Sequence, residues 1–187
     1  GGTLKSGGRD QAVAVKMLPG MSDAEAKAQF DTELKAHLVA QHGADGVCRL
    51  LGTCVKDGGL CVVMKRYDSN LADRIRAGLD PTQIRSILHN LFTTLAELHQ
   101  AGVVVKDIKP ENVLMDRRGK PHFADFGISK LITQTTKIKP TSIAGTFNYM
   151  APEAFSRDGY SIEVDIWAMA CVAIEMSTGK TPWDNLD

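Results

Sequence analysis

A short stretch of the sequence groups four side chains that suit metal binding and proton transfer, namely Asp107, Lys109, Asn112 and Asp125. Carboxylate and amide oxygens are hard ligands of the kind Mg²⁺ accepts, and Mg²⁺ takes its remaining ligands from water and phosphate. A further carboxylate can orient a hydroxyl and accept its proton, while an ammonium can neutralise charge on a phosphoryl group. Each residue alone is common in turns. Their combination favours a site for phosphoryl transfer.

Short apolar runs around these residues predict the strands that position them. The runs are Val103–Val105, Val113–Met115 and His122–Ala124. The first run predicts a buried strand, and Asp107 lies just after the end of that strand. The other two form a hairpin closed by the turn Asp116–Gly119. The first residue of one hairpin strand lies beside the last residue of the other, so we expect Asn112 next to Asp125.

Three ordered motifs resemble those of eukaryotic protein kinases. Asp107–Asn112 (DIKPEN) is similar to the catalytic loop, Asp125–Gly127 (DFG) to the metal-binding motif, and Ala151–Glu153 (APE) to the end of the activation segment. The resemblance covers essentially the whole chain. It implies an α+β, two-lobed fold, with a small antiparallel-sheet lobe over 1–66 and a mainly helical large lobe over 67–187, both incomplete.

The resemblance also implies the reaction, which is transfer of the γ-phosphoryl group of ATP to a protein hydroxyl with Mg²⁺ as cofactor. In that reading Asp107 aligns the hydroxyl, Lys109 stabilises developing charge, and Asn112 and Asp125 hold the metal. Lys109, together with Thr146 in the segment Gly145–Tyr149, favours serine or threonine over tyrosine as the acceptor.

A lysine and a glutamate in the first third of the chain match the ion pair of the same family. Lys16 ends the alternating strand Ala12–Lys16, and the capping box Ser22–Glu25 predicts a helix that runs to about Val39. Glu33 falls on that helix's apolar stripe, where a carboxylate needs a cation. We expect Lys16 to be that cation, and Glu25 to serve the helix cap instead.

The resemblance assigns further positions to the nucleotide. These cofactor-binding residues, besides Lys16 and Asp125, are Gly1, Ala14, Met64, Lys65, Arg66 and Leu114. Gly1 stands at the final glycine of the phosphate loop, whose earlier glycines are absent. Met64 is the gatekeeper behind the adenine, and Lys65 and Arg66 belong to the hinge, where backbone groups do the recognition.

Other apolar patterns predict the elements that support the site. Val47–Leu51 and Leu60–Met64 form a hairpin. A helix capped by Asp80 carries one apolar stripe, which is Ile84, Ile87, Leu88, Leu91, Phe92, Leu95 and Leu98. The predicted helix of the other apolar run, Ile166–Ile174, is buried on nearly all sides. The first predicted helix, which runs to about Val39, has the inner stripe Phe30, Leu34, His37 and Leu38.

The segment between Asp125 and Glu153 has little apolar periodicity and reads as a mobile loop. Its hydroxyl residues are Thr133, Thr135, Thr136, Thr141 and Ser142, of which Thr141 and Ser142 are the candidate phosphorylation sites. Lys106 stands where most of the family has arginine. A lysine cannot hold a phosphate through a bidentate fork, so we expect weaker control by phosphorylation of this segment.

Two acidic residues have structural roles by the same resemblance. Asp165 is expected to hold the backbone of the catalytic loop. Glu153 is expected to lack its arginine partner, because the chain stops at Asp187 before the helix that supplies that arginine in the family.

Composition describes a globular protein without a charge bias. The 187 residues include 22 Lys plus Arg and 22 Asp plus Glu, which gives no reason to expect a nucleic-acid partner. The four cysteines have no metal-binding spacing and are interpreted as reduced core residues. No apolar run is long enough to span a bilayer. We expect an intracellular, cytoplasmic protein, and the oligomeric state stays open.

Two other classes of function remain. In a pseudokinase the fold would bind nucleotide or a partner without turnover, and Val105 and Lys106 before Asp107 leave that alternative open. A small-molecule kinase of related fold is disfavoured by Gly145–Thr146 and Ala151–Glu153.

Overall fold

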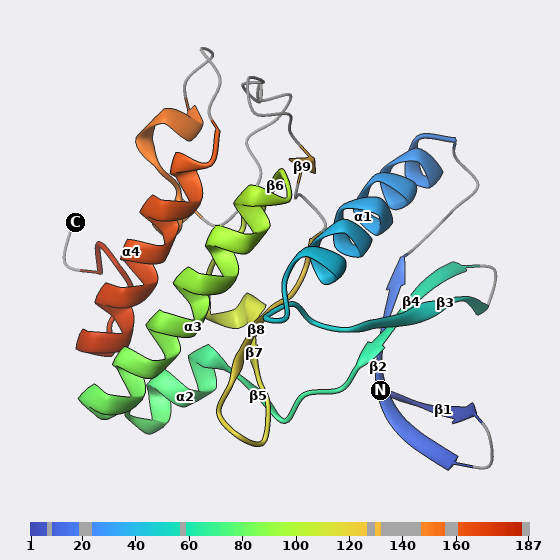
Figure 1. Ribbon diagram of the computed structural model, residues 1–187, viewed down its shortest axis with the longest axis horizontal. Helices are drawn as coiled ribbons and strands as arrows, with labels where there is room; N and C mark the ends of the chain where they lie inside the picture. Colours follow the sequence, from blue (N-terminus) through green and yellow to red (C-terminus); the bar gives the residue numbers. More distant parts are fainter. Residues whose placement is uncertain are drawn as a thin grey trace.

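The computed structural model describes residues 1–6, 9–18, 24–56, 59–126, 130–131, 147–155 and 161–184. An antiparallel sheet with one helix occupies one end of the molecule, and three helices occupy the other, with short strands between them (Figure 1). The predicted α+β fold class is therefore confirmed. None of the helices in the described ranges is both long and apolar enough to cross a membrane.

The four-stranded sheet presents one face to the middle of the molecule. Its antiparallel order is β1 (Gly2–Ser6), β2 (Arg9–Leu18), β4 (Gly59–Lys65) and β3 (Leu50–Lys56). In the β2–β4 register Ala14 faces Met64 and Lys16 faces Val62. Alternate residues of a strand share a face, so these four side chains lie on one side of the sheet.

Helix α1 (Ala24–Gly43) packs against this sheet and ends later than the predicted Val39. Phe30 packs with Leu50 and Val62 in a small core. Leu38 was predicted on the inner stripe but is 37% exposed. Ala36 and Ala40 are buried and lie one helical turn apart on the same face of α1. Leu38 lies midway between them in the sequence, so its side chain points away from that face toward solvent. Ser22 of the predicted capping box lies outside the described residues.

The segment before β3 connects the sheet to the centre of the molecule. A strand was predicted from Val47, but β3 begins at Leu50 and Val47 instead forms an isolated parallel bridge with Phe123. The backbone N–H of Cys48 donates to the Phe123 carbonyl at 2.7 Å, and the Phe123 N–H donates to the Gly46 carbonyl at 2.8 Å. The first of these bonds uses a backbone N–H of the predicted strand Val47–Leu51, which is therefore paired with Phe123 and not with β4.

The central strands lie between the two ends. β5 (Ser69–Asn70), β7 (Val113–Met115) and β8 (Pro121–Phe123) form one sheet, and β6 (Val103–Val104) pairs with β9 (Lys130–Leu131). Val103, Val113 and Phe123 belong to the main core, where they are at most 1% exposed. The strands next to the candidate site are thus held by apolar burial.

The remaining helices are α2 (Leu71–Ala77), α3 (Pro81–Gln100) and α4 (Glu163–Thr178). The Asp80 carboxylate caps α3 as predicted, by accepting from the N–H groups of Thr82 and Gln83. Phe92 is 42% exposed, so its place on the buried stripe was wrong. The buried stripe of α3 runs through Ile87, Leu91, Leu95 and Leu98.

Helix α4 was predicted to be buried on nearly all sides, and that prediction was wrong. Ile166 and Ile174 are 48% and 50% exposed. One face of α4, which includes Met169 and Val172, packs in the main core with residues of α3. The apolar run therefore contributes one buried face to the structure described.

Candidate active site

The backbone just before Asp107 is anchored to helix α4 through one buried carboxylate. Asp165 has no exposed surface. Its Oδ2 accepts from the Val105 N–H at 2.9 Å, and its Oδ1 accepts from the Lys106 N–H at 2.8 Å. His99 at the end of α3 places Nε2 2.9 Å from the same Oδ2. Asp165 thus fixes the strand exit from which Asp107 projects.

Lys106 occupies an unusual backbone position within this anchor. Its φ of 73° lies in the left-handed region, which costs free energy for a residue with a side chain. Burial lowers the pKa of the Lys106 ammonium, and the nearby Asp165 charge only partly opposes this. The Lys106 side chain is thus half-buried and close to the Asp165 carboxylate.

Asp107, Lys109 and Asn112 form one hydrogen-bonded group. Asn112 Nδ2 donates to the Asp107 carbonyl at 2.9 Å and to Asp107 Oδ2 at 2.8 Å. Lys109 Nζ lies 3.0 Å from the same Oδ2. Because both partners of Nδ2 are acceptors, the orientation of the Asn112 amide is determined, and its oxygen remains the acceptor for another group.

The hairpin formed by β7 and β8 brings Asn112 to Asp125. Val113 faces Phe123 in the register, and the Ala124 N–H donates to the Asn112 carbonyl at 2.9 Å. Asn112 therefore pairs with Ala124 through the backbone, and Asp125 is the next residue. Asp125 itself has a φ of 58°, so the chain turns sharply at this point.

Lys16 lies between two carboxylates from distant parts of the chain. Its Nζ is 2.9 Å from Glu33 Oε1 on α1 and 2.7 Å from Asp125 Oδ1. Burial by itself lowers the pKa of Lys16, but the hydrogen bonds and charges of Asp125 and Glu33 raise it overall. The lysine therefore stays charged and joins the sheet, α1 and the hairpin.

A cleft of about 530 Å³ lies between the sheet and the hairpin. It is lined by most of the predicted nucleotide and metal residues, namely Ala14, Lys16, Glu33, Met64, Lys65, Arg66, Asn112, Leu114 and Asp125. Gly1 is not among the lining residues and lies near Val13 and Arg66. The structure thus brings together every predicted nucleotide residue except Gly1.

Two histidines support the site, and only His37 was expected to be packed, on the inner stripe of its helix. His37 on α1 lines the cleft and packs on the ring of Phe126, with the ring centroids 4.9 Å apart. Its Nε2 donates to the Cys48 carbonyl at 2.6 Å, and burial lowers the pKa of the imidazole. His99 was missed altogether, because nothing in the sequence around it points to Asp165.

Of the segment between Asp125 and Glu153, residues 127–129 and 132–146 lie outside the described residues, and these include Thr141, Ser142 and Thr146. The 3₁₀ helix Phe147–Tyr149 is tied to α4, because the Tyr149 hydroxyl donates to Glu175 Oε2 at 2.5 Å. Glu153 is partly exposed and makes no ion pair with another residue of the described ranges.

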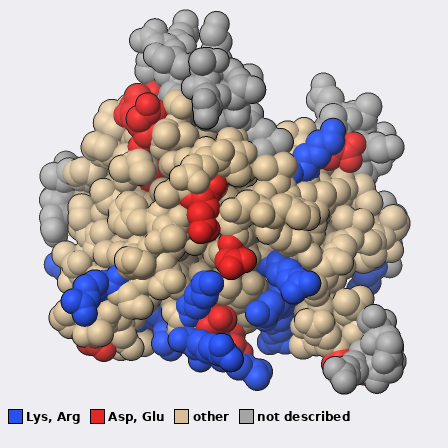
Figure 2. Space-filling view, in the orientation of Figure 1, with Lys and Arg blue, Asp and Glu red and all other residues tan. Residues whose placement is uncertain are grey.

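On the face shown in Figure 2, basic side chains gather in the lower part around a few acidic ones, and acidic side chains lie near the middle. Neither sign of charge covers this face. That distribution agrees with equal totals of 22 basic and 22 acidic residues.

A sheet-and-helix end, a helical end, and a cleft with a lysine between two carboxylates define a kinase-like phosphotransferase fold. The family model for the protein kinase domain matches residues 3–187. The chain therefore belongs to the protein kinase family.

Curated relatives agree with this family. The chain is 32% identical over 158 residues to mitogen-activated protein kinase kinase kinase 3 of Arabidopsis thaliana, covering 82% of the chain and 24% of that protein. It is 36% identical over 115 residues to the serine/threonine-protein kinase BCK1/SLK1/SSP31 of Saccharomyces cerevisiae, covering 61% of the chain and 8% of that protein. The chain thus spans about a quarter of the length of the Arabidopsis relative and less than a tenth of the length of the yeast relative.

Proposed function

We propose that this chain transfers the γ-phosphoryl group of MgATP to a serine or threonine hydroxyl of a protein. The observation that carries this proposal is the contact of Lys16 with both Glu33 and Asp125 in the same cleft that Asn112 lines. The serine/threonine kinases among the relatives support the choice of acceptor.

The residues present fit a magnesium ion. Asp125 offers a carboxylate that is 47% exposed on the cleft, and Asn112 offers an amide oxygen whose orientation its own hydrogen bonds determine. Mg²⁺ prefers such oxygen ligands in small number and completes its shell with water and phosphate. When bound, the metal would offset negative charge on the phosphates.

We propose the following roles for the other residues that line the cleft. Lys16, oriented by Glu33, binds phosphate oxygens of the nucleotide, while Ala14, Met64 and Leu114 provide the apolar walls for the adenine. Backbone groups of the hinge at Lys65 and Arg66 recognise the adenine edge.

The acceptor hydroxyl is oriented by Asp107, whose Oδ2 is held by Lys109 and Asn112 and accepts the hydroxyl proton. Lys109 is proposed to stabilise the charge that develops on the transferring group. Thr146 is proposed to contact Asp107 and Lys109. Thr141 or Ser142 is proposed to be a site of regulatory phosphorylation. Asp165 and Glu153 are assigned structural roles.

Binding of MgATP is expected to raise the melting temperature of the chain by about 5–10 °C at a ligand concentration of about 100 times Kd. The Asp125→Ala variant should lose the part of this rise that depends on Mg²⁺, because it removes the only charged ligand proposed for the metal. A thermal shift series with ATP, Mg²⁺ and both together measures the effect.

Asp68→Ala is the matched control, since Asp68 is a half-exposed aspartate whose carboxylate pairs with Arg117 rather than lining the cleft. It should keep the full rise. A cooperative melt without any rise in the unmodified chain would contradict nucleotide binding and favour a pseudokinase that serves as a scaffold. A rise without phosphorylation of a Ser/Thr peptide library would contradict the phosphotransfer step alone.

We further propose that the substrate is a protein and that the chain is located inside the cell, in the cytoplasm, where MgATP is abundant. We also propose that the boundary between the two lobes lies between Arg66 and Tyr67. The boundary is supported by the position of Lys65 at the end of β4, after which the chain leaves the sheet.

A further inference from the structure

Two cysteines that are separated in the sequence are neighbours in the small sheet. Cys54 on β3 and Cys61 on β4 are paired directly in the antiparallel register. Directly paired residues of antiparallel strands have Cα atoms about 4.5–5.5 Å apart and side chains on the same face. A disulfide needs Cα atoms roughly 4.4–6.8 Å apart. The backbone therefore already has the spacing of a cross-strand disulfide.

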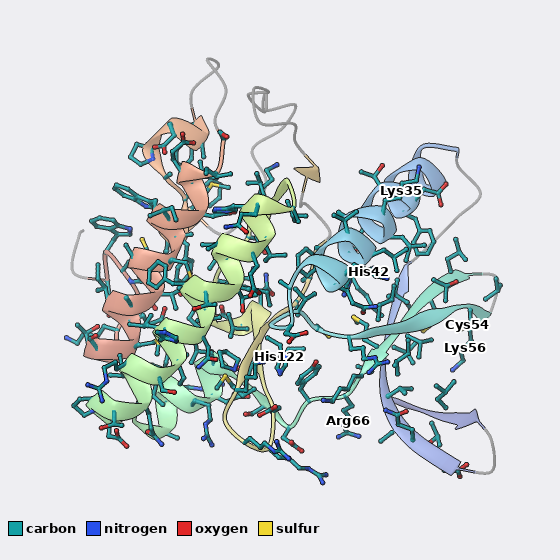
Figure 3. All side chains as sticks on the ribbon, viewed as in Figure 1. Lys35, His42, Cys54, Lys56, Arg66 and His122 are labelled. Atoms are coloured by element: carbon teal, nitrogen blue, oxygen red, sulfur yellow. The ribbon has the colours of Figure 1, made fainter. Side chains whose placement is uncertain are left out.

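The two thiols differ sharply in access to solvent. Cys54 is exposed, which contradicts its expected place in the core, and it lies on the hairpin of β3 and β4 beside Lys56 (Figure 3). Cys61 has no exposed surface. The Cys61 thiol donates to the Gly59 carbonyl at 3.8 Å. A small oxidant in solution therefore meets Cys54 first.

The remaining cysteines are poor partners for Cys54. Cys48 and Cys171 are both buried, and neither lies opposite it in the sheet. Burial raises the pKa of the Cys61 thiol, and the neighbouring Cys54 raises it further. Direct attack of an oxidant on Cys61 is thereby slowed, so its chemistry depends on Cys54.

We propose that Cys54 and Cys61 are a site of reversible oxidation by peroxide, with Cys54 as the oxidised thiol and Cys61 as the resolving thiol. The Cys54 sulfur attacks one oxygen of hydrogen peroxide, the O–O bond breaks, and Cys54 sulfenic acid and water form. The Cys61 sulfur then attacks the Cys54 sulfur, and the S–O bond breaks. The leaving hydroxide takes the Cys61 proton and departs as a second water. Two thiols lose two electrons and the peroxide gains them.

This site is independent of the proposed phosphotransfer, because neither cysteine lines the nucleotide cleft. The cross-link would fasten β3 to β4 beside Val62, which does line the cleft. The sheet that carries Lys16 would then contain a disulfide bond that a thiol reductant can break.

The test is mass spectrometry of the native full chain after treatment with hydrogen peroxide. Free thiols are blocked with iodoacetamide before the chain is denatured, and trypsin is added without reductant. Cleavage after Lys56 separates Cys54 from Cys61, so a disulfide appears as one species that joins Leu50–Lys56 to Asp57–Lys65. We expect this species, at a mass two hydrogens below the sum of its parts, and its loss on addition of dithiothreitol.

Two variants assign the order of events. In Cys61→Ser, Cys54 should accumulate as sulfinic acid, because no thiol resolves its sulfenic acid. In Cys54→Ser, Cys61 should remain a thiol at the same peroxide concentration. Cys48 and Cys171 report folding in every sample, since they escape iodoacetamide only while buried.

Three results would overturn the proposal. In the first, Cys54 of the unmodified chain becomes sulfinic acid while Cys61 stays reduced. In the second, Cys54 forms a cross-link with Cys48. In the third, Cys54 stays reduced under peroxide while the chain is folded.

Discussion

Asp107→Asn is expected to lower kcat for peptide phosphorylation by at least about 10²-fold while leaving the affinity for MgATP unchanged. The substituted amide has nearly the same shape as the carboxylate, so the loop keeps its geometry. It has no negative charge and cannot accept the proton of the hydroxyl. The predicted loss therefore comes from the transfer step, and binding in the cleft is retained.

The hydrogen bonds of Asp107 explain why the effect should be confined to that step. Asp107 Oδ2 accepts a hydrogen bond from Asn112 Nδ2 and lies 3.0 Å from Lys109 Nζ. Neither contact involves the residues proposed to form the walls around the adenine. Asn112 also donates to the Asp107 carbonyl, a bond that the substitution keeps. The nucleotide residues on the sheet are untouched.

Steady-state phosphorylation of a Ser/Thr peptide library, with calorimetric titration of MgATP in parallel, separates the two quantities. Asp68→Asn serves as a control for a charge change outside the cleft and should have unchanged kcat. Equal losses of kcat and of nucleotide affinity in Asp107→Asn would refute the role assigned to Asp107. An Asp107→Asn variant that retained turnover would do the same.

Asp165→Ala is expected to lower the free energy of unfolding by about 3–5 kcal/mol. The carboxylate has no exposed surface and accepts from two backbone N–H groups, at Val105 and Lys106. Alanine removes the acceptor for both donors, and for His99, inside the protein. Each buried donor that loses its acceptor costs about 1–3 kcal/mol, so several together make a large effect.

The same variant should also lose peptide phosphorylation at temperatures where it is still folded. Lys106 has a φ of 73°, and the Asp165 bond to its N–H helps to hold that left-handed conformation immediately before Asp107. When the bond is lost, the backbone can relax and move Asp107. A displacement of about 1 Å at a reacting group costs on the order of 10²-fold in rate.

Urea denaturation measures the stability change, and the phosphorylation assay is run well below the melting temperature of the variant. Glu163→Ala is the matched control, because Glu163 lies in the same first turn of α4 but is exposed. It should change the free energy of unfolding by less than about 1 kcal/mol. A comparably small change for Asp165→Ala would mean that the anchor contributes little to the fold.

Local sequence patterns were sufficient for features that depend on near neighbours. The Asp80 cap, the hairpin around Asp116–Gly119 and the proposed catalytic residues at its base are encoded within a few positions. The structure shows the cap and the strands close to where they were expected. Hydrogen bonds within a turn or cap need only local geometry, which the residue types determine.

Periodicity was less reliable for the exposed or buried state of single apolar residues. Leu38, Phe92, Ile166 and Ile174 continue apolar stripes, yet each is at least 37% exposed. A helix has one face toward each neighbour, and the neighbours decide how wide that buried face is. The sequence of the helix alone does not contain their positions.

The sequence by itself determined the class of fold and the residues that could perform the chemistry, because side-chain type and spacing decide which ligands and proton acceptors are present. Only the tertiary structure decided how they meet. The contact of Lys16 with Asp125 spans 109 positions, that of Val105 with Asp165 spans 60, and the pairing of Cys54 with Cys61 depends on the register of two strands. Such contacts result from packing of distant elements around a common core, and no local pattern specifies them.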